Sequence, residues 1–199
     1  MGPLRRGAAE AVLCPGPAIG LIEVQSIARG ITVADAMVKR AAVQLCLNRP
    51  VSPGKHLTLC SGEVAEVQEA MLAGRERAGT SLCDELLLTL VHDEVLDILR
   101  RSERRPLDPD FALAIVETFS AAATLLAADT ACKAAEITLH ELRLCDGLGG
   151  KGFVILTGEQ DMVEAALAAA QHGLQPGLYL GHELIPRPHP DMLESLLRS

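Results

Sequence analysis

The stretch Ala18-Ile-Gly-Leu-Ile-Glu23 decides the fold, because it returns later in the chain as Ala112-Leu-Ala-Ile-Val-Glu117. The displacement is 94 positions, and the same displacement carries Ala34-Asp35 to Ala128-Asp129. Similarity at a fixed displacement over many positions is the signature of an internal repeat. The sequence therefore predicts two copies of one folding unit.

The agreement continues along both copies with one interruption. Lys39 corresponds to Lys133 at the displacement of 94, whereas Gly54-Lys55 corresponds to Gly150-Lys151 at a displacement of 96. The second copy thus carries two extra residues after Arg143. An insertion confined in this way indicates a surface loop rather than a core element.

Each copy has the pattern strand, helix, two strands, helix, strand. Short apolar runs predict strands in the first copy, and helical spacing of apolar residues predicts the helices between them. The expected strands are 18–23, 43–48, 56–61 and 85–91, and the expected helices are 27–42 and 62–78. Pro50-Val-Ser-Pro-Gly54 is a turn by composition. One face of the first expected helix carries Ile31, Ala34, Met37, Val38 and Ala41.

The order βαββαβ is the ferredoxin-like arrangement, so the expected fold class is α+β with two tandem units. One further helix is expected at 93–101 and another near Pro190 to Arg198. The expected organisation is an N-terminal extension at 1–17, domains at 18–101 and 111–199, and a polar linker at 102–110.

Composition excludes several classes of protein. With 49% hydrophobic and 22% charged residues among 199, the chain has the make-up of a globular protein. A net charge of -8 and only four aromatic residues argue against nucleic-acid binding, which needs cationic surfaces or stacking platforms. No apolar run approaches the ~18 residues of a membrane span. We expect a soluble protein of the cytosol with its cysteines reduced.

No catalytic pattern stands out, so we do not expect an enzyme. Gly147-Leu-Gly-Gly-Lys151 is superficially similar to a phosphate loop, but that motif needs glycine where Cys145 stands and Ser or Thr at Gly152. The six histidines are dispersed, without zinc spacing or a nucleophilic triad. A regulatory module that binds a small effector between its two copies remains an alternative.

Four further motifs occur in order: Ala34-Asp-Ala-Met-Val-Lys39, Pro53-Gly-Lys55, Ser61-Gly-Glu-Val-Ala65 and Ile185-Pro-Arg-Pro-His189. With the repeated strand, they resemble the bacterial microcompartment shell domain in its tandem form, and within it the single-layer propanediol-utilisation type. The resemblance implies a homotrimer whose six domains form a flat pseudohexameric tile. Such tiles pack edge to edge with other shell proteins in the bacterial cytoplasm, and head-to-tail contacts of this kind close into rings.

The resemblance also implies roles for individual residues at the tile edge. In the family an exposed lysine after the first helix lies at this edge, and an arginine of the last motif reaches across it. Asp35 and Asp129 are expected to be structural and to hydrogen-bond near the subunit seam. The residues expected at the tile edge are Lys39, Lys133, Arg187 and His189.

The turns before the two Gly-Lys pairs correspond to the family's pore loops. The expected pore-lining residues are Val51, Ser52, Pro53, Gly54, Gly147, Leu148 and Gly149, around an opening for small polar metabolites. Some relatives carry Cys at the position of Ser52 and hold an iron–sulfur cluster there. Such clusters need thiolates, so Ser52 predicts no cofactor. Cys145 in the longer loop is the remaining metal-ligand candidate, and an electron conduit built on it stays an alternative.

Overall fold

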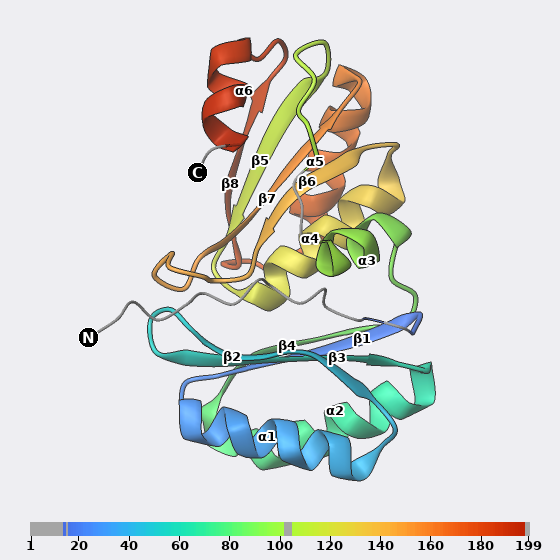
Figure 1. Ribbon diagram of the computed structural model, residues 1–199, viewed down its shortest axis with the longest axis vertical. Helices are drawn as coiled ribbons and strands as arrows, with labels where there is room; N and C mark the ends of the chain where they lie inside the picture. Colours follow the sequence, from blue (N-terminus) through green and yellow to red (C-terminus); the bar gives the residue numbers. More distant parts are fainter. Residues whose placement is uncertain (1–13, 15, 102–104, 198–199) are drawn as a thin grey trace, which may run out of the picture.

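The computed structural model describes residue 14, residues 16–101 and residues 105–197. It contains two units of similar architecture, each a sheet with helices packed against it (Figure 1). Most of the extension expected at 1–17, and the beginning of the linker expected at 102–110, lie outside the described residues.

The first unit is a four-stranded antiparallel sheet in the order β2-β3-β1-β4. A short 3₁₀ turn, Gly79–Ser81, leads into β4, and α3 (Asp93–Arg100) follows the sheet. The remaining elements are β1 (Ala18–Val24), α1 (Ile27–Arg40), β2 (Gln44–Val51), β3 (Lys55–Gly62), α2 (Val64–Ala78) and β4 (Leu82–Leu88).

The second unit repeats this topology with the strand order β6-β7-β5-β8, again antiparallel throughout. Two tandem ferredoxin-like units of the α+β class, as predicted, are therefore confirmed. The extra residues of the second copy lie in the β6–β7 loop. The elements are β5 (Ala112–Thr118), α4 (Ala121–Ala134), β6 (Thr138–Arg143), β7 (Gly152–Gly158), α5 (Gln160–Gly173), β8 (Tyr179–Ile185) and α6 (Pro190–Leu197).

The last strand of the first unit lies earlier than the sequence predicts. It spans Leu82–Leu88 rather than 85–91, because the 3₁₀ turn brings the chain into the sheet sooner. The apolar residues of the predicted strand that follow Leu88 lie in the connection to α3. The backbone N–H of Val91 donates to the carbonyl of Pro17, and the ring of His92 caps α3. An apolar run marks burial and does not by itself distinguish a strand from a buried connection.

One hydrophobic core is continuous across both units. Helices α1 and α2 cover one face of the first sheet, whereas α4 of the second unit lies between the two sheets and packs against β1 and β4 (Figure 1). Because β1 is covered on both faces, all its residues are buried. The shared core joins Leu21 and Leu59 of the first sheet, Val95 of α3, and Leu125 of α4. In the part of the chain that is described, no helix is long and apolar enough to cross a membrane.

Candidate functional site: the paired loops and the domain seam

The two loops that the sequence predicts to line a pore lie against each other. The N–H of Ser52, in the β2–β3 turn, donates to the carbonyl of Cys145 in the β6–β7 loop, with a nitrogen–oxygen distance of 3.2 Å. Beside this bond, Arg49 Nη2 and Asp146 Oδ2 form an ion pair at 2.5 Å. Both loops project on the same side of the molecule (Figure 1). One chain therefore contributes both loops to a single place.

The tips of these loops carry small side chains. The turn closes by a hydrogen bond from the N–H of Gly54 to the carbonyl of Val51, and Gly54 has φ +92°, which favours glycine. Val51 is buried in the shared core, so it offers little to the surface of the loop. Among the other expected pore residues, Ser52 and Leu148 are half-buried, whereas Pro53, Gly54, Gly147 and Gly149 are exposed.

The thiol of Cys145 is buried within its own loop. Its Sγ donates to the carbonyl of Gly150 at 3.1 Å, and burial raises its pKa to about 12. Iron binds the thiolate form, which this environment disfavours, and Ser52 supplies a hydroxyl instead. No group of three metal-ligating side chains occurs among the residues that the structure describes. Within one chain, the two loops thus present a serine hydroxyl and a buried thiol.

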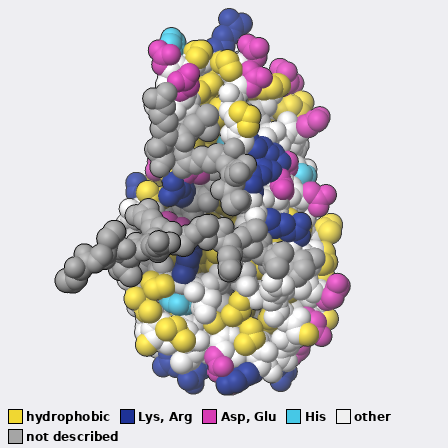
Figure 2. All heavy atoms as spheres, in the orientation of Figure 1, with side chains coloured by type: hydrophobic (Ala, Val, Ile, Leu, Met, Phe, Trp, Pro, Cys, Tyr) yellow, Lys and Arg dark blue, Asp and Glu magenta, His cyan; other side chains and the backbone are white. Residues whose placement is uncertain are grey.

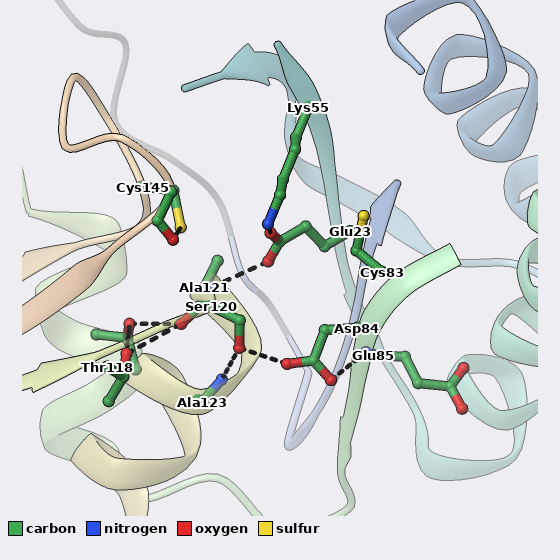
Figure 3. Close-up of polar contacts among 12 residues, drawn as sticks. Glu23, Lys55, Cys83, Asp84, Glu85, Thr118, Ser120, Ala121, Ala123 and Cys145 are labelled. Atoms are coloured by element: carbon green, nitrogen blue, oxygen red, sulfur yellow. Dashed lines mark hydrogen bonds and ion pairs between the residues drawn. The ribbon is translucent and has the colours of Figure 1, made fainter. Parts of the chain in front are cut away.

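Next to the loops, a buried carboxylate joins the two domains. Glu23 Oε1 accepts from Lys55 Nζ at 2.6 Å, and Oε2 accepts from the N–H of Ala121 at 3.0 Å, at the start of α4 (Figure 3). A helix N-terminus attracts negative charge, so the start of α4 is a suitable partner for this carboxylate. Burial opposes the charge on Lys55, but the hydrogen bond to Glu23 and the negative charge of Glu23 together raise the pKa of the ammonium.

A second carboxylate holds the same helix end. Ser120 is the N-cap of α4: its Oγ accepts from the N–H of Ala123 at 3.0 Å and donates to Asp84 on β4 (Figure 3). The other oxygen of Asp84 accepts from the N–H of Glu85 at 2.9 Å. An N-cap hydroxyl satisfies a backbone donor that the helix leaves free, and here it also binds the neighbouring domain.

The far end of α4 makes a third contact with the first domain. Asp129 accepts from the N–H of His92 at 2.8 Å and from Lys133 Nζ at 2.5 Å. Lys133 Nζ also donates to the carbonyl of Leu90, at 2.5 Å. Asp129 therefore hydrogen-bonds at the seam between the two domains of one chain, and the expected place near a subunit seam stays a prediction. Lys133, expected at the tile edge, lies here on the same seam.

The corresponding face of α1 is open. Ile31 and Val38 are 56% and 41% exposed, whereas their counterparts in α4, Leu125 and Cys132, are 0% and 5% exposed. Ile31 and Val38, which the sequence places on one apolar face of this helix, are therefore not covered by the chain itself. The buried residues of the helix are Gly30, Val33, Ala34 and Met37, and the face expected from the sequence includes only Ala34 and Met37 of these.

The polar groups of the seam also have open counterparts. The Asp35–Lys39 ion pair at 2.7 Å matches Asp129–Lys133, but the side chain of Asp35 is 57% exposed against 3% for Asp129. Glu117 matches Glu23 and lies 4.0 Å from Lys151, with 52% of its side chain exposed against 0% for Glu23. Two further residues expected at the tile edge, Arg187 and His189, are exposed.

The sequence-based prediction did not identify Glu23, Lys55 and Asp84 as seam residues. A signal was present for two of them: Glu23 stands in an otherwise apolar strand, and both Glu23 and Lys55 recur in the second copy, as Glu117 and Lys151. Asp84 gave no signal, because its place in the second copy is taken by another residue type.

The BMC domain family matches the chain twice, over residues 18–91 and 112–188. The chain belongs to the BMC family of bacterial microcompartment shell proteins. A relative from Citrobacter freundii, the bacterial microcompartment shell protein PduT, is 38% identical over 181 residues, covering 90% of this shell protein and 97% of PduT. The match thus includes both domains.

Other relatives agree with this assignment. The carboxysome shell protein CsoS1C of Halothiobacillus neapolitanus is 37% identical over 90 residues, covering 44% of this chain and 92% of its own length, so it corresponds to one domain. The crystal structure of a microcompartment protein from Desulfitobacterium hafniense DCB has 45% identity and a TM-score of 0.79, covering 89% of this chain and 98% of that one. This shell protein therefore has a structurally characterised relative of the same two-domain length.

Proposed function

We propose that three copies of this shell protein close into a flat tile of six BMC domains, with a central pore at the paired loops. The tile packs edge to edge with other shell proteins around a microcompartment in the bacterial cytoplasm. The observation that carries the proposal is the open face of α1, whose counterpart on α4 is buried against the neighbouring domain.

The contact between the two domains is of the head-to-tail kind. The sheet and following turn of the first domain meet α4 of the second, so the two surfaces in contact differ. Each chain then retains one unused surface of each kind: the outer face of α1 on the first domain, and Glu117 with the Arg187–His189 turn on the second, beside the part of the sheet that α6 covers. A heterologous interface either closes into a ring or continues as a filament, and the BMC family membership supports the ring.

Three pairs of loops would surround the axis of the ring. Their exposed tips carry Pro53, Gly54, Gly147 and Gly149, with the Ser52 hydroxyl beside them. Backbone groups and hydroxyls suit the passage of small polar metabolites. Serine at position 52 and the buried thiol of Cys145 support a pore without an iron–sulfur cluster.

A structural role without catalysis follows from the same features. The shell proteins to which the chain is similar and the small side chains of the loops support a passage rather than a reaction site. The alternative of an effector-binding regulatory module loses support, because the two copies meet through a shared apolar core and a network of ion pairs.

Light scattering after size-exclusion chromatography tests the assembly. We expect a species of about three times the chain mass of 21.1 kDa, and electron microscopy of concentrated, ligand-free protein should show hexagonally packed tiles. A monomer or a twofold dimer at every concentration would contradict the proposal.

Anoxic reconstitution with iron and sulfide tests the pore. We expect no visible charge-transfer absorbance from the wild-type protein. A cluster that forms, and is lost in Cys145→Ala, would overturn this part of the proposal and assign the ligand.

A further inference from the structure

The seam inside the chain is the interface between α4 and the first domain, and it is the pattern on which we model an interface between two copies of the chain. Several groups that join α4 to the first domain have repeat counterparts on open surfaces of the molecule. On one side these are the apolar face of α1 and the Asp35–Lys39 pair. On the other they are Glu117 and the Arg187–His189 turn.

We infer that Glu117 of one copy binds the N-terminus of α1 in a second copy of this chain, while the Asp35–Lys39 pair of that second copy binds the backbone of the Arg187–His189 turn. The inference rests on the proposed trimer and names the polar contacts that hold it together. It also gives Lys39 a contact in the seam inside the tile, in addition to the place at the tile edge that the resemblance implies.

The first contact follows from the two helix starts. Ser26 caps α1 by accepting from the N–H of Arg29 at 3.2 Å, as Ser120 caps α4, so the N–H of Ile27 occupies the position of the Ala121 N–H. No acidic residue stands in the first turn of α1 to offset its dipole. A carboxylate supplied by a neighbour is the stabilising partner of such a helix end. Glu117 is that carboxylate by position, with Lys151 at 4.0 Å as Lys55 is beside Glu23.

The second contact follows from the two turns. The Nδ1 of His189 accepts from the N–H of Asp191 at 3.3 Å, as the Nδ1 of His92 accepts from the N–H of Glu94 at 3.2 Å. Since both turns start a helix through the same histidine cap, they present the same backbone groups. The carbonyl of Arg187 and the N–H of His189 thus stand where the corresponding groups of Leu90 and His92 bind Lys133 and Asp129.

The seam between copies is not a full duplicate of the seam within the chain. Gly181 pairs with Glu117 across the sheet as Asp84 pairs with Glu23, so glycine replaces the carboxylate that binds the helix cap. Ser26 of the second copy therefore has no equivalent of the Asp84 contact. With fewer polar links, the seam between copies is the weaker one, and the tile separates into folded chains before a chain unfolds.

Glu117→Gln tests the first contact, with Glu63→Gln as a matched control on the exposed start of α2. Loss of a charge-assisted hydrogen bond weakens each of three seams about tenfold. Because trimer formation depends on the third power of monomer concentration, the midpoint for dissociation on dilution should rise by about thirtyfold. Mass photometry measures this midpoint, and exchange between tagged and untagged trimers should accelerate even where dilution leaves the trimer intact. The inference would be overturned if Glu117→Gln, like the control Glu63→Gln, kept the dissociation midpoint and the exchange rate of the wild-type trimer.

Lys39→Met distinguishes a contact of this lysine in the seam from a contact at the tile edge. If Lys39 binds the turn of a neighbouring copy in the same tile, the variant raises trimer dissociation and subunit exchange in dilute solution. If trimers keep the wild-type exchange rate and only the packing of tiles into sheets is lost, the lysine acts at the edge and the inference is wrong for this residue.

Failure of the proposed function has a different signature. In that case the wild-type protein itself is monomeric or dimeric, and the variants have no trimer to weaken. A stable wild-type trimer that is insensitive to Glu117→Gln and Lys39→Met would leave the shell function standing and remove only the seam contacts inferred here.

Discussion

At the scale of single residues, the environment of a side chain and not its identity decides what it does. Glu23 and Glu117 occupy the same position in equivalent strands, each near a lysine. Glu23 is buried because α4 follows in the same chain, whereas Glu117 faces solvent in the single chain. A buried charge without partners is costly, so Glu117 would need a partner such as the start of α1 once a second copy covers it.

Burial of His140 predicts how stability depends on pH. Burial lowers the pKa of this imidazole; Arg105, Arg101 and Glu94 lie nearby, and its Nε2 hydrogen-bonds Thr157 Oγ1 at 2.7 Å. A histidine with a lowered pKa is protonated more readily in the unfolded chain. Its stabilising contribution is complete above the ordinary pKa of about 6.5 and is lost as the pH falls through the lower folded value.

We therefore expect the urea midpoint of the wild-type protein to fall as the medium is acidified through this range. His140→Gln retains a side chain that can bond Thr157 but does not titrate, so its midpoint should fall less steeply. Equal slopes for the two proteins would show that His140 does not contribute to the pH dependence.

At the scale of elements, α1 shows why an apolar pattern can be misread. The helix carries two apolar faces, one for its own sheet and one that includes Ile31 and Val38. Helical periodicity indicates that a face is apolar, but not which neighbour covers it. The equivalent helix α4 has both faces buried, because the first domain of the same chain supplies the second neighbour.

The close packing around Gly74 of α2 predicts that replacing this glycine destabilises the protein. A Cβ on Gly74 would lie 2.4 Å from Cδ1 of Ile22 and 2.9 Å from Cγ of Met37. Alanine favours the helix by roughly 1 kcal/mol over glycine, but overpacking a core costs about 1–3 kcal/mol. Because those contacts are so close, we expect Gly74→Ala to lower the free energy of unfolding by about 1–2 kcal/mol net in urea titrations.

Gln68→Ala, on the exposed side of α2, is the matched control and should stay within about 0.5 kcal/mol of wild type. A Gly74→Ala protein as stable as this control would show that α2 can shift away from Ile22 and Met37 without loss.

At the scale of the whole molecule, one chain covers the outer apolar face of α4 but leaves the equivalent face of α1 exposed. Its surface shows apolar and charged groups interspersed (Figure 2), and the apolar residues on α1 are those with buried counterparts on α4. In the proposed trimer, fusing two domains makes one seam intramolecular and leaves the other to association. The chain then fixes the order of the domains around the proposed ring.

Paired substitutions on α1 and α4 should separate folding from assembly. Ile31→Asp places a charge on the open face, so we expect a chain with native far-ultraviolet circular dichroism that is monomeric by light scattering. Leu125→Asp places the same charge in the shared core, where an unpaired carboxylate costs several kcal/mol, and should prevent folding. A trimeric Ile31→Asp protein would contradict the proposed use of this face.

The sequence alone determined the duplication, the βαββαβ order, the α+β class and the position of the loops, because repeats and periodicity are local properties that survive without coordinates. It could not place the start of β4, since an apolar run looks alike in a strand and in a buried connection. Only the tertiary structure decided that α4 lies between the two sheets, that Glu23 binds the N-terminus of this helix, and that Cys145 is buried. These facts depend on contacts between residues about a hundred positions apart, which no local pattern encodes.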